Sequence, residues 1–550
     1  MPSTTTSPPP AAALRRRGWA ARLPFLVQRH RYLFLLLIAL LWLPAFNGQW
    51  RIGPDSAFYA TVARNLVEGR GYTHPLGNAS FASPGLPYLL AGNFALFGAE
   101  SFFATVLLMW LMGVAILALT YHLLRIHGSG RAALAVTLLL AINSVFLAHA
   151  LEVLTDIPFM LGVMLFLVGY ERYEKHVGRP WINWSMILAG GAIMTAFRII
   201  VIIVLAALVI TLVYRALRQR RFKLLALAAL ATAAPLAIRL LFPGAGLTTK
   251  EQEIFDRLLH GLPLTLERAW HHNLPNLFTQ VTPGALLGSV VSPDLWFIDA
   301  AIAVTGLGLG VMLVRRRVLW GVLVILFIVQ WVLFLPDVRY FLPILPLLAY
   351  AWYRGARQAL LVWPARSLGA VVAVVMISLW VGVNVVRCGH FVIEQRRPAL
   401  LEHYMHGRYW RVDEVGHQLR QAVEPQATIL TDVKWSKPIT FYSQRRAISP
   451  QDFKQFPVGN GPLYVIEPYD ELMALLLRKR GWTAGPSVLT VDRSPVASPL
   501  HVRRVVRSGP LSLGERAGVR GRPDDKDAQA GLQGNCIWLF RSLSLLRERL

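Results

Sequence analysis

The chain has 550 residues, of which 55% are hydrophobic and only 16% are charged, and its formal net charge is +26. A soluble globular domain does not have this composition, whereas a polytopic membrane protein does. The basic excess gathers in short clusters between apolar segments, as the positive-inside rule requires, so we expect no nucleic-acid partner. The two cysteines, Cys388 and Cys536, define neither a disulfide framework nor a metal motif.

Residues 1–30, a Pro/Ser/Thr-rich stretch followed by a basic run, predict a cytoplasmic N-terminal tail. A spanning helix needs about 20 mostly apolar residues. The chain offers eleven candidates, at 31–47, 101–124, 131–149, 153–171, 181–197, 199–217, 224–242, 296–314, 318–335, 338–353 and 367–386. We therefore expect a polytopic α-helical membrane protein of about 11 spans, with its membrane domain at 31–386.

A further apolar stretch, "GLPYLLAGNFALFG" at 85–98, is too short to span the bilayer. We expect it to lie along the membrane in the first outer loop, beside an amphipathic helix over 56–68. This choice puts most of the loop arginines and lysines on one side, where Glu171 and Glu174 are the only acids. That side is predicted to be cytoplasmic.

The last span then delivers the rest of the chain to the outer side. In 387–505, "ATILTDV" and "GPLYVIEP" predict strands and "YDELMALLLRKRGW" predicts a helix, so we expect a small extracytoplasmic α/β domain. The Gly/Arg-rich end, 506–550, has the composition of a disordered tail.

Charged side chains gather at the outer face in this topology, as a site for a charged substrate would require. They are Asp55 after the first span, Glu152 and Asp156 between the third and fourth, Arg198 between the fifth and sixth, and Asp337 and Arg339 at the start of the tenth. Structural alternatives stay open. Asp55 has the position of an N-cap, and Glu152 shares a helix face with Asp156 only if the helix continues through both.

The order of four segments, "PDSAFYATVARNLVEGRGY", "FASPGLPYLLAGNFALFG", "EVLTDIPFM" and "VRYFLPILPLLAY", resembles that of the polytopic glycosyltransferases of the C fold. The nearest types are the protein mannosyltransferases, the aminoarabinose transferases and bacterial proteins with a rhizobial core-oligosaccharide transferase-like domain. The resemblance implies sugar transfer from a polyprenyl-phosphate donor, with Asp55 as the catalytic acid of the family. Many members carry a second acid in the next position, where this chain has Ser56.

The residue chemistry agrees with this reaction. A carboxylate such as Asp55 accepts the proton of an attacking hydroxyl as a general base, and a single displacement inverts the anomeric centre. Arginine matches phosphate oxygens, so Arg339 and Arg198 are the candidates for binding the donor phosphate. Further candidates for the substrate or acceptor cavity are Tyr59, Arg64, Glu152, Asp156 and Tyr340. Glu152 and Asp156 have two open roles, orienting acceptor hydroxyls or holding a divalent cation; no other cofactor is expected.

We therefore expect a multi-pass glycosyltransferase of the plasma membrane, with a cytoplasmic N-terminus and an extracytoplasmic C-terminal domain. Its acceptor would be a glycolipid, a polysaccharide or a protein. The main alternative is a transporter or a lipid-linked-saccharide flippase, which commonly has inverted repeats and a site near the midplane. No internal repeat is evident, and the charged residues collect at one face instead. A non-catalytic scaffold would leave that cluster unexplained.

Overall fold

The computed structural model describes the chain in thirteen segments and five single positions. They are residues 31–75, 77–78, 83–127, 130–220, 260–287, 296–334, 337–362, 368–396, 412–431, 435–449, 461–467, 482–491 and 500–507, with 229, 233, 473, 477 and 480. The predicted N-terminal tail, almost all of the span at 224–242 and nearly all of the tail at 506–550 lie outside the described residues. So does most of the helix predicted from "YDELMALLLRKRGW".

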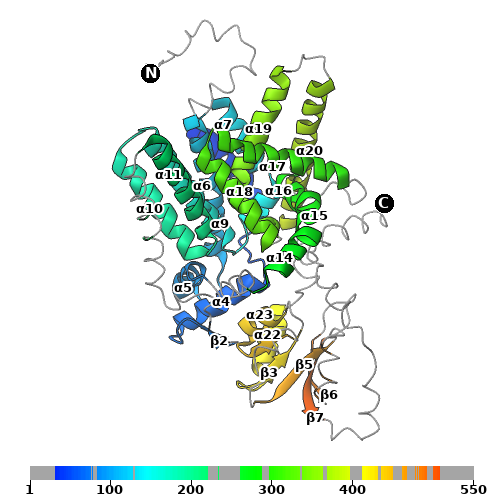
Figure 1. The fold of residues 1–550 in the computed structure, drawn as a ribbon. Helices are drawn as coiled ribbons and strands as arrows, with labels where there is room; N and C mark the ends of the chain where they lie inside the picture. Colours follow the sequence, from blue (N-terminus) through cyan, green and yellow to red (C-terminus); the bar gives the residue numbers. More distant parts are fainter. Residues whose placement is uncertain are drawn as a thin grey trace.

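The larger part of the described chain is a bundle of apolar helices (Figure 1). They are α3 (Arg31–Trp42), η1 (Leu43–Ala45), α6 (Phe103–His127), α7 (Gly130–Ala141), α8 (Ser144–His149), α9 (Asp156–Glu174), α10 (Pro180–Phe197), α11 (Val201–Gln219), α17 (Trp296–Met312), η5 (Leu313–Arg315), α18 (Val318–Leu333), η6 (Val338–Ile344), α19 (Leu345–Val362) and α20 (Leu368–Arg396). By length and composition, three described helices are able to cross a membrane: α6, α11 and the helix over Trp296–Arg315. The number of eleven spans therefore stays a prediction.

Two predicted spans are interrupted. The span expected at 131–149 is divided into α7 and α8 by Asn143, whose side-chain oxygen accepts from the Phe146 N–H at 2.9 Å and so caps α8. Its amide nitrogen donates to the Ala285 carbonyl at 2.8 Å, which ties this break to α16 (Thr282–Leu287). The span expected at 338–353 begins as the 3-10 helix η6, which contains Pro343, a residue without an N–H to donate.

Short helices cross one end of the bundle, which we call the Asp55 end. Figure 1 shows α4 (Pro54–Val67) and α5 (Gly85–Phe97) across the lower ends of the long helices. The 13 residues of α5 extend only about 20 Å, less than the roughly 30 Å of a bilayer core, in agreement with the prediction that this segment does not span. A short hairpin, β1 (Thr73–His74) with β2 (Gly77–Asn78), follows α4. The remaining short helical segments run from α14 (Leu262–Arg268) through η2 (Ala269–Asn273), α15 (Leu274–Asn276) and η3 (Leu277–Val281) to α16.

A five-stranded sheet lies below the Asp55 end (Figure 1). Its strands are β3 (Thr428–Leu430), β4 (Arg446–Ile448), β5 (Leu463–Glu467), β6 (Trp482–Val491) and β7 (Leu500–Arg507), in the order β4-β3-β5-β7-β6. The strand β3 is parallel to both neighbours, whereas β7 is antiparallel to β5 and β6. The helices α22 (Val412–Ala422) and α23 (Ser436–Ser443) lie between the sheet and the bundle, and α23 packs against α4.

Candidate active site

Asp55 lies in the first turn of α4. Gly53 precedes the helix and Pro54 opens it, a position that suits proline because its φ is already helical. The Ser56 hydroxyl accepts a hydrogen bond from the Gly53 N–H at 2.9 Å and donates to the Gly53 carbonyl at 3.0 Å. The alternative that Asp55 caps this helix is therefore wrong. Ser56 closes the first turn, and the Asp55 carboxylate interacts across the site.

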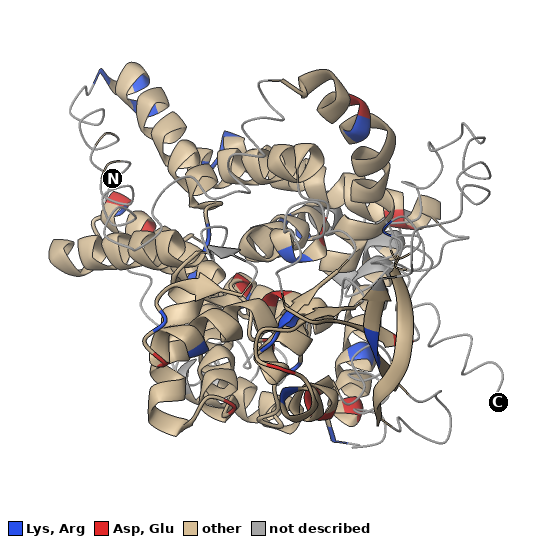
Figure 2. Ribbon diagram, turned by 90° about the horizontal axis from the view of Figure 1, so that it is seen from below, with Lys and Arg blue, Asp and Glu red and all other residues tan. Residues whose placement is uncertain are grey.

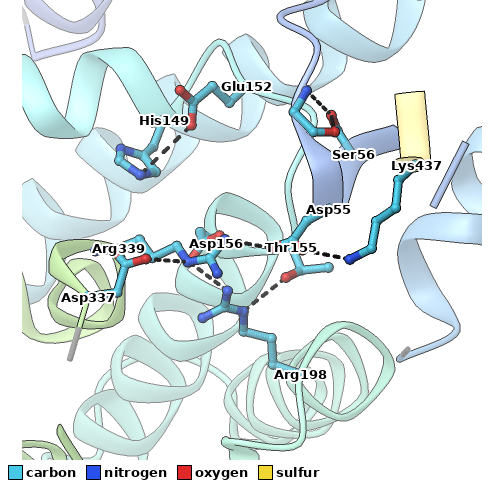
Figure 3. Close-up of polar contacts among 11 residues, drawn as sticks. Asp55, Ser56, His149, Glu152, Thr155, Asp156, Arg198, Asp337, Arg339 and Lys437 are labelled. Carbon is cyan, nitrogen blue, oxygen red and sulfur yellow. Dashed lines mark hydrogen bonds and ion pairs between the residues drawn. The ribbon is translucent and has the colours of Figure 1, made fainter. Parts of the chain in front are cut away.

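Arg339 of η6 makes the shorter of the two described ion pairs of Asp55. Its Nη1 donates to Oδ2 of Asp55 at 2.9 Å (Figure 3). Asp337 holds the same arginine from the other side, with its Oδ2 at 3.1 Å from Nε and its Oδ1 accepting from the Arg339 backbone N–H at 3.1 Å. The second contact also caps η6. Asp337 therefore fixes both the start of the helix and the direction of the guanidinium.

Arg198 is held in a second ion pair beside the first. It follows the end of α10 in an extended conformation. Its Nη2 lies 2.8 Å from Oδ1 of Asp156, and its Nε donates to the Thr155 hydroxyl at 2.9 Å (Figure 3). Asp156 begins α9 and is only 1% exposed. Because the paired carboxylate is buried, Arg198 is fixed at the rim of the bundle.

Two tyrosines connect these ion pairs. The ring centroid of Tyr340 lies 4.8 Å from the guanidinium carbon of Arg198 and 5.4 Å from that of Arg339, which are cation–π distances. Tyr59 is one turn after Asp55 and shares its helix face. Burial raises the pKa of Tyr59, and the Asp55 carboxylate raises it further. Arg198 and Arg339 lower this pKa, but by less. Its phenol therefore stays protonated and able to donate a hydrogen bond.

A residue that sequence reasoning missed completes the site. Lys437 of α23 places its Nζ 3.8 Å from Oδ1 of Asp55 and 5.8 Å from the ring centroid of Phe58 (Figure 3). The surrounding sequence, "KWSKPIT", has no motif that would indicate a site. Only the packing of α23 on α4 brings this lysine to the carboxylate.

His74 lies behind Lys437 and carries no charge at neutral pH. Its ring stacks on Phe58 with 4.4 Å between centroids. Burial, with a smaller effect of Lys437, lowers the pKa of His74 to about 3. Lys437 and Arg339 are therefore the cations in contact with Asp55 among the described ion pairs.

Arg64 does not line this site. At 3.6 residues per turn it is about 180° around α4 from Asp55. Its Nη2 lies 3.3 Å from Glu100, its guanidinium carbon lies 4.1 Å from the ring centroid of Phe441, and its Nη1 donates to the Phe441 carbonyl. The prediction for Arg64 is wrong. This arginine fastens α4 to α23 instead.

Glu152 and Asp156 do not form a pair. The segment between α8 and α9 is not helical, and α9 begins only at Asp156, so the two carboxylates share no helix face. Glu152 lies 3.9 Å from Arg51 and 3.8 Å from His149, whereas Asp156 contacts Arg198. Within the described segments, no group of three or more His, Cys, Asp or Glu side chains is placed to hold a metal ion. The two acids therefore have different partners in this structure, and a divalent cation bound by them stays a prediction.

Figure 2 looks onto the Asp55 end and shows acidic and basic residues together among uncharged ones. The described ion pairs there join α4, the starts of α9 and η6, the end of α10 and α23. A carboxylate is thus surrounded by guanidinium and ammonium groups at the rim of an apolar bundle. Such an arrangement suits an anionic group joined to an apolar tail.

Comparison with known proteins identifies the fold. A family model described as dolichyl-phosphate-mannose-protein mannosyltransferase matches residues 74–238, a range that contains Asp156 and Arg198 but not Asp55. An uncharacterized protein of Aquifex aeolicus (strain VF5) is 28% identical over 160 residues, which are 27% of this chain and 30% of that relative's length. The match thus spans under a third of the relative.

Solved structures match most of the chain. ArnT from Cupriavidus metallidurans bound to undecaprenyl phosphate has a TM-score of 0.51 at 16% identity, over 88% of this chain and 99% of that one. The Archaeoglobus fulgidus oligosaccharyltransferase, tethered to an acceptor peptide, has a TM-score of 0.51 at 13% identity, over 87% of this chain and 74% of that one. This chain thus shares the fold of these two membrane proteins, and under a third of its length resembles the dolichyl-phosphate-mannose-protein mannosyltransferase family.

Proposed function

We propose that this protein transfers a sugar from a polyprenyl-phosphate donor to an acceptor hydroxyl at the extracytoplasmic face of the plasma membrane. The observation that carries the proposal is the contact between Asp55 and Arg339, beside the Arg198–Asp156 pair. A general base and two phosphate-binding groups are the parts that such a transfer requires. The Asp55 end would be extracytoplasmic, as the charge of the loops predicts.

The related structures support the two substrate classes. ArnT was crystallised with undecaprenyl phosphate, and the archaeal oligosaccharyltransferase with an acceptor peptide. A polyprenyl phosphate has an anionic head and an apolar tail, and the tail would lie in lipid against the bundle. The head would meet Arg339 and Arg198, whose planar guanidinium groups bind phosphate oxygens in pairs.

The reaction would be a single displacement. The acceptor oxygen bonds to the anomeric carbon while the bond from that carbon to the phosphate oxygen breaks, and the hydroxyl proton passes to Asp55. The polyprenyl phosphate leaves with the bonding electrons as an anion, which Arg339 and Arg198 stabilise. Attack from the face opposite the leaving group inverts the anomeric centre.

The ion pairs in the structure suggest how binding of the polyprenyl-phosphate sugar frees Asp55 to act as the base. Arg339 now donates to Asp55 at 2.9 Å. If the donor phosphate accepted the hydrogen bond from Nη1 of Arg339 instead, Oδ2 of Asp55 would be free to accept from the acceptor hydroxyl. Lys437, near Oδ1, would still favour the ionised carboxylate. Asp337 keeps Arg339 oriented throughout. The base would therefore become available only when the donor is bound.

The remaining polar groups have positioning roles in this proposal. Asp156 and Thr155 hold Arg198, and the protonated Tyr59 offers a hydrogen bond to the sugar or to the phosphate. Glu152 is left as a candidate for orienting the acceptor. A structure of the archaeal neighbour is a complex with Zn and sulfate. No step for the present chain is assigned to a cation, because its carboxylates are paired with arginines and lysine.

A transfer assay tests the proposal. The full chain is reconstituted in vesicles and supplied with a radiolabelled polyprenyl-phosphate sugar or, separately, with the corresponding nucleotide sugar. We expect label in the acceptor fraction from the lipid-linked donor alone, and transfer from the nucleotide sugar alone would contradict the proposal. The glycolipid and glycoprotein profile of a deletion strain identifies the acceptor to be used.

A further inference from the structure

A cavity of about 350 Å³ opens at the end of the bundle opposite Asp55. Its polar lining comes from α6, the turn after α17 and α19. We call it the arginine cavity, after its charged residues: Arg315, Arg316, Arg317 and Arg354, with Tyr350 and His127 beside them. Arg354 lies roughly 20 Å beyond Arg339 along η6 and α19, so this cavity is separate from the site of Asp55.

Among the described residues, the four guanidinium groups have little protein counter-charge. Glu171 and Glu174 are the only acids in the loops that the sequence predicts to be cytoplasmic. Glu174 is paired with Arg215, and Glu171, 2.6 Å from Nε2 of His127, brings a single carboxylate to the edge of the cavity. In the described part of the chain, no ion pair joins a carboxylate to any of the four cavity arginines. Like charges brought together around one cavity repel each other unless an anion enters.

Buried side chains hold part of the cavity wall. Arg354 donates to the Tyr350 hydroxyl at 3.3 Å. The Tyr350 ring packs edge-on against Trp320 with 5.7 Å between centroids, and His127 does the same at 5.1 Å. Trp320 is fully buried and Tyr350 is 5% exposed. Part of the cationic lining is therefore held in place before any ligand binds, which lowers the entropic cost of binding.

The other part of the lining is apolar. Leu309, Met312 and Leu313 of α17 and η5 face the same cavity, and Met312 is 50% exposed. A free phosphate would gain nothing from these residues. A phospholipid would place its acyl chains against them and its phosphate among the arginines, as basic pockets between spanning helices do.

The geometry points to a binding site for the phosphate headgroup of an anionic phospholipid of the cytoplasmic leaflet. The positive-inside rule explains why arginines occur at this end, but it does not require them to converge on one cavity. The bound lipid would supply the missing counter-charge and link α17 to α19. Through α19, which continues from η6, it would stabilise the element that carries Arg339.

Ligand-dependent unfolding tests the inference without reading sugar transfer. The purified full chain in neutral detergent is titrated with phosphatidylglycerol, phosphatidylcholine or glycerol 3-phosphate, because a ligand of the folded state raises the unfolding temperature. The cavity variant is Arg317→Gln/Arg354→Gln. The matched control, Arg179→Gln/Arg218→Gln, removes two exposed arginines that the charge distribution puts on the same side but that do not line the cavity.

We expect phosphatidylglycerol, and not phosphatidylcholine, to stabilise the wild type. The cavity variant should bind phosphatidylglycerol at least about tenfold more weakly, because charge-assisted bonds to phosphate are lost, and the control should stay within about threefold of wild type. Equal weakening in both variants, or equal stabilisation by phosphatidylcholine, overturns the inference. Glycerol 3-phosphate acting at the same concentrations would support the phosphate site and assign it to a soluble ligand. Should the double cavity variant not fold, Arg317→Gln and Arg354→Gln are titrated singly, and undiminished binding of phosphatidylglycerol by both overturns the inference.

Discussion

Asp55 meets two cations that are remote from it in sequence, Arg339 of η6 and Lys437 of α23. Arg339 is the closer, at 2.9 Å against 3.8 Å, and it is also fixed by Asp337. In the proposed reaction it exchanges the carboxylate for the donor phosphate. The arginine would therefore control donor binding, whereas the lysine would act on the base.

Arg339→Ala should raise the KM for the polyprenyl-phosphate donor about tenfold or more, because one charge-assisted contact to phosphate is lost. Initial rates over a range of donor concentrations measure this effect. Arg70→Ala is the control, since Arg70 is an exposed arginine just beyond the end of α4. An unchanged donor KM in Arg339→Ala would remove this residue from the phosphate site.

The sequence predicted many of the residues that meet here. Asp55, Arg198, Arg339, Asp156, Tyr59 and Tyr340 were expected in one site, and the structure brings them together. The prediction for Arg64 was avoidable. Nine residues are two and a half helical turns, so Arg64 lies on the face of α4 opposite Asp55. Lys437 was not predictable, since nothing in a single sequence indicates that α23 packs on α4.

At the scale of elements, the contact between α9 and α10 positions the Arg198–Asp156 pair. The helix α9 starts at Asp156 and α10 ends just before Arg198. Between these ends two glycines face each other so closely that a Cβ on Gly190 would lie 2.6 Å from the Gly162 carbonyl oxygen and 2.7 Å from the Phe166 nitrogen. Backbone atoms on both sides leave no room for a side chain.

Gly190→Ala should lower the unfolding free energy by about 1–3 kcal/mol, since the added methyl group forces the helices apart. It should also reduce transfer, because α9 and α10 together place Arg198. Gly191→Ala is a close control: the same substitution one residue later meets nothing within 4 Å. Thermal unfolding and transfer rates of the two variants are compared. Equal stability of the pair would show that the close approach is not needed.

The contact between α4 and α23 brings the C-terminal part to the site. Phe441 is fully buried, and its ring centroid lies 5.3 Å from that of Trp50. The guanidinium group of Arg64 packs over the Phe441 ring in a cation–π contact. This packing sets the position of Lys437, one turn earlier on α23. The strands of this part were expected from their patterns, but its docking was not, because long-range packing leaves no periodic signal in the sequence.

Lys437→Ala should reduce kcat several-fold with little change in donor KM, because the lysine contacts the base rather than the phosphate. Lys437→Arg should restore much of the rate by returning a cation. Steady-state kinetics of the three proteins separate the two parameters, and limited proteolysis checks that the C-terminal part stays docked. A rise in donor KM with constant kcat would instead place Lys437 on the donor.

At the scale of the whole molecule, charge divides the bundle into two ends. The Asp55 end combines acids with bases, whereas the opposite end carries the arginine cavity with two loop acids, Glu171 beside His127 and Glu174 paired with Arg215. Apolar length alone leaves the number of spans a prediction, since only three described helices are long and apolar enough by themselves to cross a membrane. The break at Asn143 divides the run at 131–149, a boundary that apolar length alone did not predict.

Cysteine labelling tests the assignment of the two ends. In a chain with Cys388 and Cys536 replaced by serine, Ser487→Cys on β6 and Arg218→Cys on α11 give exposed thiols. In intact cells a membrane-impermeant thiol reagent should label position 487 and not 218. Disruption of the membrane should make both reactive. Labelling of position 218 alone in intact cells would reverse the proposed orientation.

The most direct test of the account is the transfer rate of Asp55→Asn with a polyprenyl-phosphate donor. Asparagine keeps the shape of the side chain and leaves the Gly53–Ser56 turn intact, but it cannot take the proton of the acceptor hydroxyl. We predict normal expression and unfolding temperature, with a loss of rate of about 100-fold or more, while Glu68→Gln at the other end of α4 stays active. Wild-type transfer by Asp55→Asn would contradict the assignment of the base.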